Sequence, residues 1–290
     1  MTVTMTTLKT ALLDLLAAVG DPDFRPLIGG GYGIYLKYQE VLNIKPRTLL
    51  TERPDARSTN DIDMFLRTEL LINGKRLEPL KAALEKIGYK AVKGAEYYQF
   101  AKPGPDGGRA GGVKLDLLAG PQALLKEKGL KADDRRVRTI NPKVKGLHAH
   151  PVDEAPTLEV DCSEYSIQGR LSSGDETESV VLLPHPFTFI MMKLFALRDR
   201  VDDSEKDYGR HHALDLYAIF SLMSENEWAV CQRLRKEFSD NDIVKEAGGV
   251  VADFFGYDEA KGMIRLREHP YRTPNFQLNE FREALVDLLT

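Results

Sequence analysis

The stretch STNDIDMFL, residues 58–66, places two aspartates two positions apart in an otherwise apolar segment. Asp61 and Asp63 alternate with the apolar residues Ile62, Met64 and Leu66. A period of two predicts a β-strand with one apolar and one acidic face. Two like charges on one face of a half-buried strand are unfavourable unless a cation neutralises them. A divalent metal supplies that cation, because Mg²⁺ prefers carboxylate oxygens.

A third carboxylate lies in a second alternating run, VKLDLLA, residues 113–119. This run and AEYYQFAK (95–102) flank the glycine-rich segment 103–112, which predicts an antiparallel hairpin with a long tip. If the strand of Asp116 lies beside that of Asp61 and Asp63, three carboxylates converge and can hold two metal ions. The alternatives are a chance DxD pair and a loop-capping aspartate. The hypothesis fails if Asp116 faces away or if a salt bridge fills its position; Lys114 shares its face.

A glycine cluster, IGGGYG (28–33), precedes a predicted helix at about residues 32–42. Glycine lets the backbone approach a ligand closely, and a helix N-terminus offers free N–H groups to a phosphate. The cluster matches neither the Walker motif nor the dinucleotide fingerprint. A tight packing turn is the structural alternative.

The remaining patterns predict an α/β (α+β) protein with a small mixed-sheet lobe and a mainly helical C-terminal lobe. Helical spacing predicts helices over residues 8–19 and 74–89, and the proline-broken segment 43–58 is typical of a loop. Residues 126–180 have β-like pieces at 157–167 and 179–183, with the polar run 172–179 as a linker or surface loop. From residue 185 onward the pattern is helical. We therefore expect domains at 1–180 and 181–290.

Composition limits the class of protein. The 290 residues are 42% hydrophobic and 29% charged, with a net charge of −4, which is ordinary for a globular protein. Two distant cysteines argue against a disulfide scaffold or a zinc site. No apolar run reaches a membrane-spanning length, and the N-terminal segment is expected to be an amphipathic helix and not a signal peptide. These features favour a cytoplasmic location with no membrane partner.

The ordered set of GGGYGIYLKY, STNDIDMFL and VKLDLLAG resembles nucleotidyltransferases of the DNA polymerase β superfamily. In the C-terminal half, FIMMKLFALRDR and KDYGRHHALDLYAI resemble the lysine-bearing and aspartate-bearing helices of the AbiEii-like branch. That branch contains toxins of toxin–antitoxin and phage-defence systems, some of which modify tRNA ends. The resemblance covers roughly residues 27–220.

The resemblance implies a nucleotidyltransferase that uses an NTP and Mg²⁺ or Mn²⁺. Asp61, Asp63 and Asp116 would bind the metals, with Asp116 as the third ligand or the base. The triphosphate would be held by residues of two segments, Gly29, Gly30 and Gly31 together with Lys193. Asp215 would orient the region of Lys193. A snorkelling role for Lys193, and an ion pair of Asp215 with Arg210 or His211, are the structural alternatives.

The sequence departs from the family pattern in three places. Gly31 stands where many members carry serine, and the spacing from Gly29 to Asp61 is longer than usual. The inserted segment carries Arg47, Arg53 and Arg57, which would reach a phosphate or face solvent. The aspartates of KDYGRHHALD are also spaced more widely than in the commonest toxins, which bears on the branch more than on the superfamily.

The acceptor is less well defined by the sequence. Residues 126–145 hold eight basic and three acidic side chains, which suits an RNA backbone or a solvated surface. We expect RNA, most specifically tRNA, as acceptor and an antitoxin protein as a further partner, both chiefly by resemblance. The alternatives are a small-molecule nucleotidyltransferase of the antibiotic-modifying kind, and a nucleotide-binding protein of the same fold without catalysis.

Overall fold

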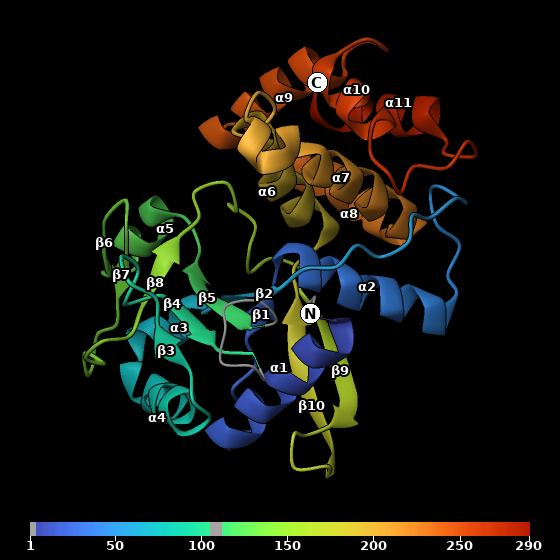
Figure 1. Ribbon diagram of the computed structural model, residues 1–290. Coiled ribbons are helices and arrows are strands. Elements are labelled where there is room, and N and C mark those ends of the chain that lie inside the picture. The colour runs from blue at the N-terminus through green and yellow to red at the C-terminus, as the bar shows by residue number, and fades with distance from the viewer. Residues whose placement is uncertain (1–3, 105–111) are drawn as a thin grey trace. The chain divides into compact units, whose positions relative to one another are not determined.

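The computed structural model describes residues 4–104 and 112–290 and divides the chain into two compact units (Figure 1). The sheet unit comprises Met1–Leu36, Arg57–Asp153 and Glu159–Pro184, and the helical unit comprises Lys37–Ala56, Glu154–Leu158 and His185–Thr290. The segments 37–56 and 154–158 thus belong to the same unit as the C-terminal residues, although both precede residue 180 in the sequence.

The protein is a mixed α/β fold, as the sequence predicts. The sheet unit contains, in chain order, α1 (Met5–Val19), β1 (Leu27–Ile28), the start of α2 (Gly30–Ile44), β2 (Asp61–Phe65), α3 (Thr68–Ile72), the 3₁₀ helix η1 (Gly74–Leu77), α4 (Glu78–Lys86), β3 (Lys90–Ala91), β4 (Gln99–Lys102), β5 (Val113–Ala119), α5 (Gln122–Glu127), β6 (Lys131–Ala132), β7 (Val137–Arg138), β8 (His148–Pro151), β9 (Ser163–Arg170) and β10 (Glu176–Leu183).

The described strands form one mixed sheet in the order β6-β7-β8-β5-β2-β1-β10-β9, with β3 and β4 branching from β5. β5 pairs in parallel with β2 and with β8, whereas β4 pairs with it antiparallel, as the predicted hairpin requires. The centre of the sheet is therefore β2 and β5, the two strands that carry the aspartates.

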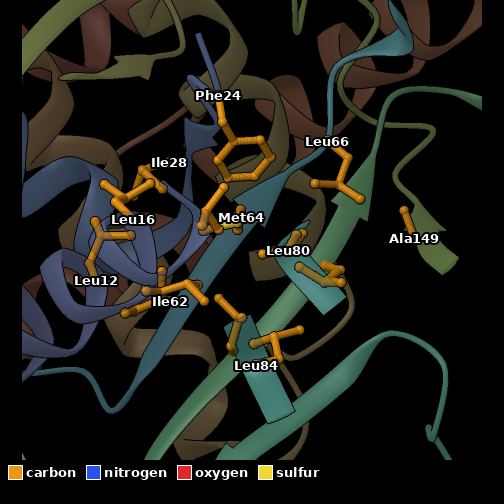
Figure 2. Packing of buried hydrophobic residues seen from close by; sticks show 14 of the residues in the cluster. Leu12, Leu16, Phe24, Ile28, Ile62, Met64, Leu66, Leu80, Leu84 and Ala149 are labelled. Carbon is orange, nitrogen blue, oxygen red and sulfur yellow. The ribbon is translucent and has the colours of Figure 1, made fainter. Parts of the chain in front are cut away.

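Alternation along these strands separates a core face from a polar face. Ile62 and Met64 are at most 1% exposed and lie in the main hydrophobic cluster, whereas Asp61 and Asp63 are only partly buried. Figure 2 shows Leu12 and Leu16 of α1, and Leu80 and Leu84 of α4, gathered around Ile62 and Met64. Because burial of this cluster favours only one register of β2, it also fixes the direction of the carboxylates.

The helical unit contains the end of α2, α6 (Pro186–Arg198), the irregular η2 (Ser204–Gly209), α7 (Arg210–Leu222), α8 (Glu225–Glu237), α9 (Asp242–Phe255), α10 (Lys261–Arg267) and α11 (Leu278–Leu289). α8 begins with a capping box in which Ser224 and Glu227 satisfy each other's backbone N–H groups. Aromatic residues on α7, α9 and α11 pack edge to face in its core, among them Phe220, Phe255 and Phe281.

Several local predictions were wrong in detail. The helix predicted over 74–89 is broken into η1 and α4, and the short α3 before it was not predicted. The strand predicted from residue 95 begins at Gln99, and the β-like piece at 157–167 forms a strand only from Ser163. The polar run 172–179 is not a linker, because β9 and β10 pair antiparallel and its second half lies within β10. Most of the glycine-rich tip lies outside the described residues.

No helix among the described residues is long and apolar enough to cross a membrane. Neither of the two cysteines, Cys162 and Cys231, forms a disulfide.

Candidate active site

The parallel pairing of β2 with β5 brings the predicted carboxylates to one face of the sheet. Asp63 is the register partner of Asp116, and Asp61 is the partner of Lys114. Register partners on neighbouring strands project to the same face and lie about 4.8 Å apart. Asp61, Asp63 and Asp116 therefore share the polar face, and Asp116 does not point away from the other two.

Asp116 is the most buried of these carboxylates, at 9% exposed. Its Oδ2 accepts a hydrogen bond from Lys114 Nζ at 2.7 Å, while its Oδ1 is buried without a hydrogen-bond partner in the described structure. Burial raises the pKa of this carboxyl, and the ammonium of Lys114 opposes that rise only in part. The salt bridge to Lys114 therefore occupies one oxygen of the third carboxylate and leaves the other open, so it fills the position of Asp116 only in part.

The loop before β2 holds the carboxylate of Asp61. Its Oδ1 accepts hydrogen bonds from the hydroxyl of Thr59 at 3.2 Å and from the backbone N–H of Asn60 at 3.1 Å. Both donors come from the two residues just before the strand, so the start of β2 fixes the direction of this side chain.

The glycine cluster packs directly against Asp63. The N–H of Gly29 donates to the backbone oxygen of Asp63 at 2.9 Å, and Gly30 has a left-handed φ of +61°. A Cβ added to Gly30 would lie 1.6 Å from Asp63 Oδ2, a distance that no side chain can tolerate unless the carboxylate moves. This close approach requires glycine at position 30 and places the first turn of α2 beside the acidic face.

Arg57 lies over the next glycine. A Cβ on Gly31 would come within 2.9 Å of its Nη2, so the guanidinium occupies the space that a side chain at position 31 would fill. The other two arginines of the inserted segment belong to the helical unit. Arg53 donates hydrogen bonds to the hydroxyl of Thr48 and to the backbone oxygen of Ser221, and the exposed Arg47 forms an ion pair with Glu225.

The acidic face has the donor chemistry for a divalent cation. Three carboxylates share it, and the buried Oδ1 of Asp116 has an unused acceptor position, which suits a hard cation that prefers oxygen ligands. Within residues 4–104 and 112–290, however, no three His, Cys, Asp or Glu side chains are already gathered around one ion position. A metal would require Lys114 to turn away from Asp116.

The other predicted pair lies wholly inside the helical unit. Lys193 Nζ on α6 forms an ion pair with Asp215 Oδ2 on α7 at 2.7 Å, with side chains 7% and 4% exposed. Arg210, one of the predicted alternative partners of Asp215, pairs with Asp207. The phosphate contact of Lys193 stays a prediction, and in this structure its ammonium is committed to Asp215.

His150 on β8 was not predicted from the sequence. Its register partner is Leu118, two positions beyond Asp116 on β5, so it joins the same polar face, where it opposes in part the rise in the pKa of Asp116. The alternation in HAHP, residues 148–151, was the available signal, but a four-residue strand is too short to recognise from alternation alone.

Fold and site together define a mixed α/β protein with an acidic sheet face beside a glycine turn. No family model and no curated protein matches the chain. Among solved structures, the solution structure of the antibiotic-resistance factor ANT(2'')-Ia is similar over 82% of this chain and 96% of that chain, with 17% identity and a TM-score of 0.38. A similarity at that level transfers no substrate or activity to this chain. The AbiEii-like branch has no counterpart in these comparisons and stays a prediction.

Proposed function

We propose that the protein is a metal-dependent nucleotidyltransferase that moves a nucleoside monophosphate from an NTP to an acceptor hydroxyl. The proposal rests on one observation, the parallel β2–β5 register that puts Asp61, Asp63 and Asp116 on one face. The approach of Gly30 to Asp63 supports it, because this approach places free N–H groups of a helix N-terminus beside that face.

In the proposed reaction the acceptor oxygen forms a bond to the α-phosphorus, the bond from that phosphorus to the bridging oxygen breaks, and pyrophosphate leaves. The hydroxyl proton passes to the carboxylate of Asp116, whose raised pKa suits a proton acceptor better than an ordinary aspartate does. Asp61 and Asp63, with Asp116, would hold Mg²⁺ or Mn²⁺, which when bound neutralises charge on the phosphates.

Other residues would hold the triphosphate. The N–H groups of Gly30 and Gly31 point from the first turn of α2, and the guanidinium of Arg57 lies above Gly31, where it can replace the serine hydroxyl common in the family. Lys193 is the remaining phosphate contact that the family resemblance implies. It must leave Asp215 to serve in that role.

The acceptor we propose is RNA, most specifically a tRNA end, and the biological role is that of a toxin with a cognate antitoxin. The basic stretch 126–145 supports a polyanionic acceptor, and the family resemblance supports the toxin role. Induced expression of the wild type should then arrest growth, whereas Asp63→Asn should not. Equal growth of the two strains at equal protein levels would contradict the toxin role but leave the transfer reaction standing.

Transfer itself is tested with the four NTPs, each labelled in turn on the α- or γ-phosphate, with Mg²⁺ and total RNA. Wild-type protein should attach the α-label and not the γ-label to RNA. Asp63→Asn keeps the side-chain shape and should lower the rate at least about a thousandfold, or roughly 4 kcal/mol of transition-state stabilisation.

The matched control is Asp175→Asn, which changes an exposed aspartate in the β9–β10 turn and should retain full activity. If label appeared on a small hydroxyl compound and not on RNA, the acceptor would be a small molecule and the RNA acceptor would be rejected. Full transfer by Asp63→Asn would refute the assignment of the site.

A further inference from the structure

The polar face of the sheet continues beyond Asp116 onto a surface of aromatic and basic side chains. It consists of Tyr97 and Tyr98 before β4, Arg136 and Arg138 at β7, and His148 and His150 on β8, and is named here the Tyr–His surface. All six residues belong to the sheet unit. None of them has a role in the reaction proposed above.

Two aromatic pairs build this surface side by side. The ring of Tyr97 stacks on His148 with centroids 4.7 Å apart and planes 23° apart, and the ring of Tyr98 lies 5.2 Å from that of His150. The backbone fixes the first pair, because the N–H of His148 donates to the backbone oxygen of Tyr97 at 2.8 Å. The surface is therefore held in place before any ligand binds.

Arginines complete the surface. The guanidinium of Arg136 lies 5.2 Å from the centroid of the Tyr97 ring, and Arg138 is the register partner of His148. Burial, with help from both arginines, lowers the pKa of His148, so this imidazole is neutral at physiological pH. A neutral stacked ring flanked by guanidinium groups presents flat apolar faces and phosphate-binding donors together.

This combination is the one that proteins use to bind unpaired nucleotides. Bases stack on aromatic rings without regard to sequence, and arginines contact the phosphates between them. Tyr97 is 41% exposed, so its ring remains accessible although Arg136 lies over it. A folded duplex hides its base faces and cannot use such rings.

The basic side chains around this surface also favour a polynucleotide ligand. The strands β6 and β7 and their flanks carry most of the eight basic side chains in residues 126–145, against three acidic ones. A polyanion is attracted to that stretch, whereas a polycationic small acceptor is repelled. The surface also reaches the acidic face, since His150 is the register partner of Leu118, two positions beyond Asp116 on β5.

We propose that the Tyr–His surface binds the unpaired bases and phosphates of a single-stranded polynucleotide, whose terminal hydroxyl is thereby directed toward Asp116. This inference rests on the proposed function and deepens it by naming the surface that receives the acceptor. An unpaired base takes the place of Arg136 over the ring of Tyr97, and the guanidinium turns to a phosphate.

Binding is measured by fluorescence anisotropy with a labelled twelve-nucleotide RNA, without NTP or divalent metal. The same RNA as a duplex and the same sequence as single-stranded DNA form the other arms. Single strands should bind at least about tenfold more tightly than the duplex, because only they expose base faces. Equal affinity of RNA and DNA supports recognition through base and phosphate alone, and tighter binding of RNA supports recognition that includes the 2′-hydroxyl.

Tyr97→Ala should weaken single-strand binding about tenfold, the order expected for one lost base–aromatic stack, and Tyr97→Phe should not. Arg138→Ala should reduce the salt dependence by about 0.7 in the logarithmic slope, as one lost phosphate contact requires. The controls are Tyr257→Ala and Arg170→Ala, which remove an exposed tyrosine and an exposed arginine elsewhere and should bind as the wild type does. Circular dichroism checks that each variant is folded.

Unchanged single-strand binding by folded Tyr97→Ala overturns the inference. So does a duplex that binds as tightly as the single strand, because charge alone then explains the affinity. Neither result affects the transfer reaction, which is measured separately through Asp63→Asn. Conversely, absence of label transfer leaves the binding data unchanged and counts against the proposed function only.

Discussion

Two lysine–aspartate pairs of equal length occupy different surroundings in the two units. Lys114 and Asp116 lie on the polar face of the sheet with side chains 34% and 12% exposed, whereas Lys193 and Asp215 lie between α6 and α7 at 7% and 4%. Both ion pairs measure 2.7 Å. Distance alone therefore does not set the cost of opening an ion pair. A partly hydrated pair can open for a ligand at little cost, whereas a buried pair opens only if the ligand replaces the lost ion pair.

Breaking the buried pair should have the largest effect on stability. Lys193→Met leaves the carboxylate of Asp215 without its cation in a site that is almost closed to water, which should lower the free energy of unfolding by about 3–5 kcal/mol. Urea denaturation at neutral pH measures the loss. The double variant Lys193→Met/Asp215→Leu should recover most of it, since no charge then remains buried. A loss below about 1 kcal/mol would contradict this account, because the buried pair would then contribute no more to stability than an exposed pair does.

The glycine turn tests whether the acidic face depends on close packing. Gly30→Ala forces a side chain into left-handed backbone, which costs about 1–2 kcal/mol, and it also displaces the carboxylate of Asp63. Transfer activity should therefore fall by far more than the change in stability explains. Gly174→Ala is the control, because it has positive φ but no atom within 4 Å of the added Cβ. If both variants kept full transfer activity, the position of Asp63 would be irrelevant to the reaction.

Breaking the partly hydrated pair should change stability least. Lys114→Met removes a partner that water can replace in part, so the free energy of unfolding should fall by no more than about 1 kcal/mol in the same urea experiment. The acid limb of the pH–rate profile should move to higher pH, because the ammonium of Lys114 keeps the pKa of Asp116 from rising further. An acid limb that moved to lower pH would contradict this account.

The titration of Asp116 also predicts how the free energy of unfolding changes with pH. Burial raises its pKa in the folded state above the ordinary value of 3.8, so the folded state holds this proton more tightly than the unfolded state does. Its contribution to stability is full below pH 3.8 and is lost as pH rises through the raised pKa. Asp116→Asn should therefore gain stability over wild type as pH increases from about 3.5 to 7 in urea melts. A difference that shrinks with pH would show that its pKa is lowered.

Local pattern predicted the elements that matter most for the site. DIDMF and VKLDLLA alternate with period two, and each forms the strand and presents the face that its alternation indicates. Helical periodicity likewise located α1, α6 and α7. These predictions succeeded because the face of a strand and the stripe of a helix are properties of consecutive residues.

Pairing between distant residues could not be predicted in the same way. The two-residue β1 carries no periodic signal, yet it joins β2 to β10 in the sheet. Only the family resemblance associated Asp215 with the region of Lys193, whereas the sequence neighbours offered Arg210 or His211 as partners; the structure pairs Asp215 with Lys193 of the preceding helix. Such contacts depend on how helices and strands pack, which single-sequence periodicity does not encode.

The parallel direction of β2 and β5 has a consequence for the order of assembly. Parallel neighbours cannot be joined by a tight turn, so the chain must pass through α3, α4 and the β3–β4 pair before β5 can dock. The two strands of the acidic face are therefore far apart in sequence. Asp63 lies beside Asp116 only after the long segment between β2 and β5 has folded back onto the sheet. A chain that ended between α4 and β5 would carry Gly30, Asp61 and Asp63 but lack Asp116, so β5 is the strand that completes the acidic face.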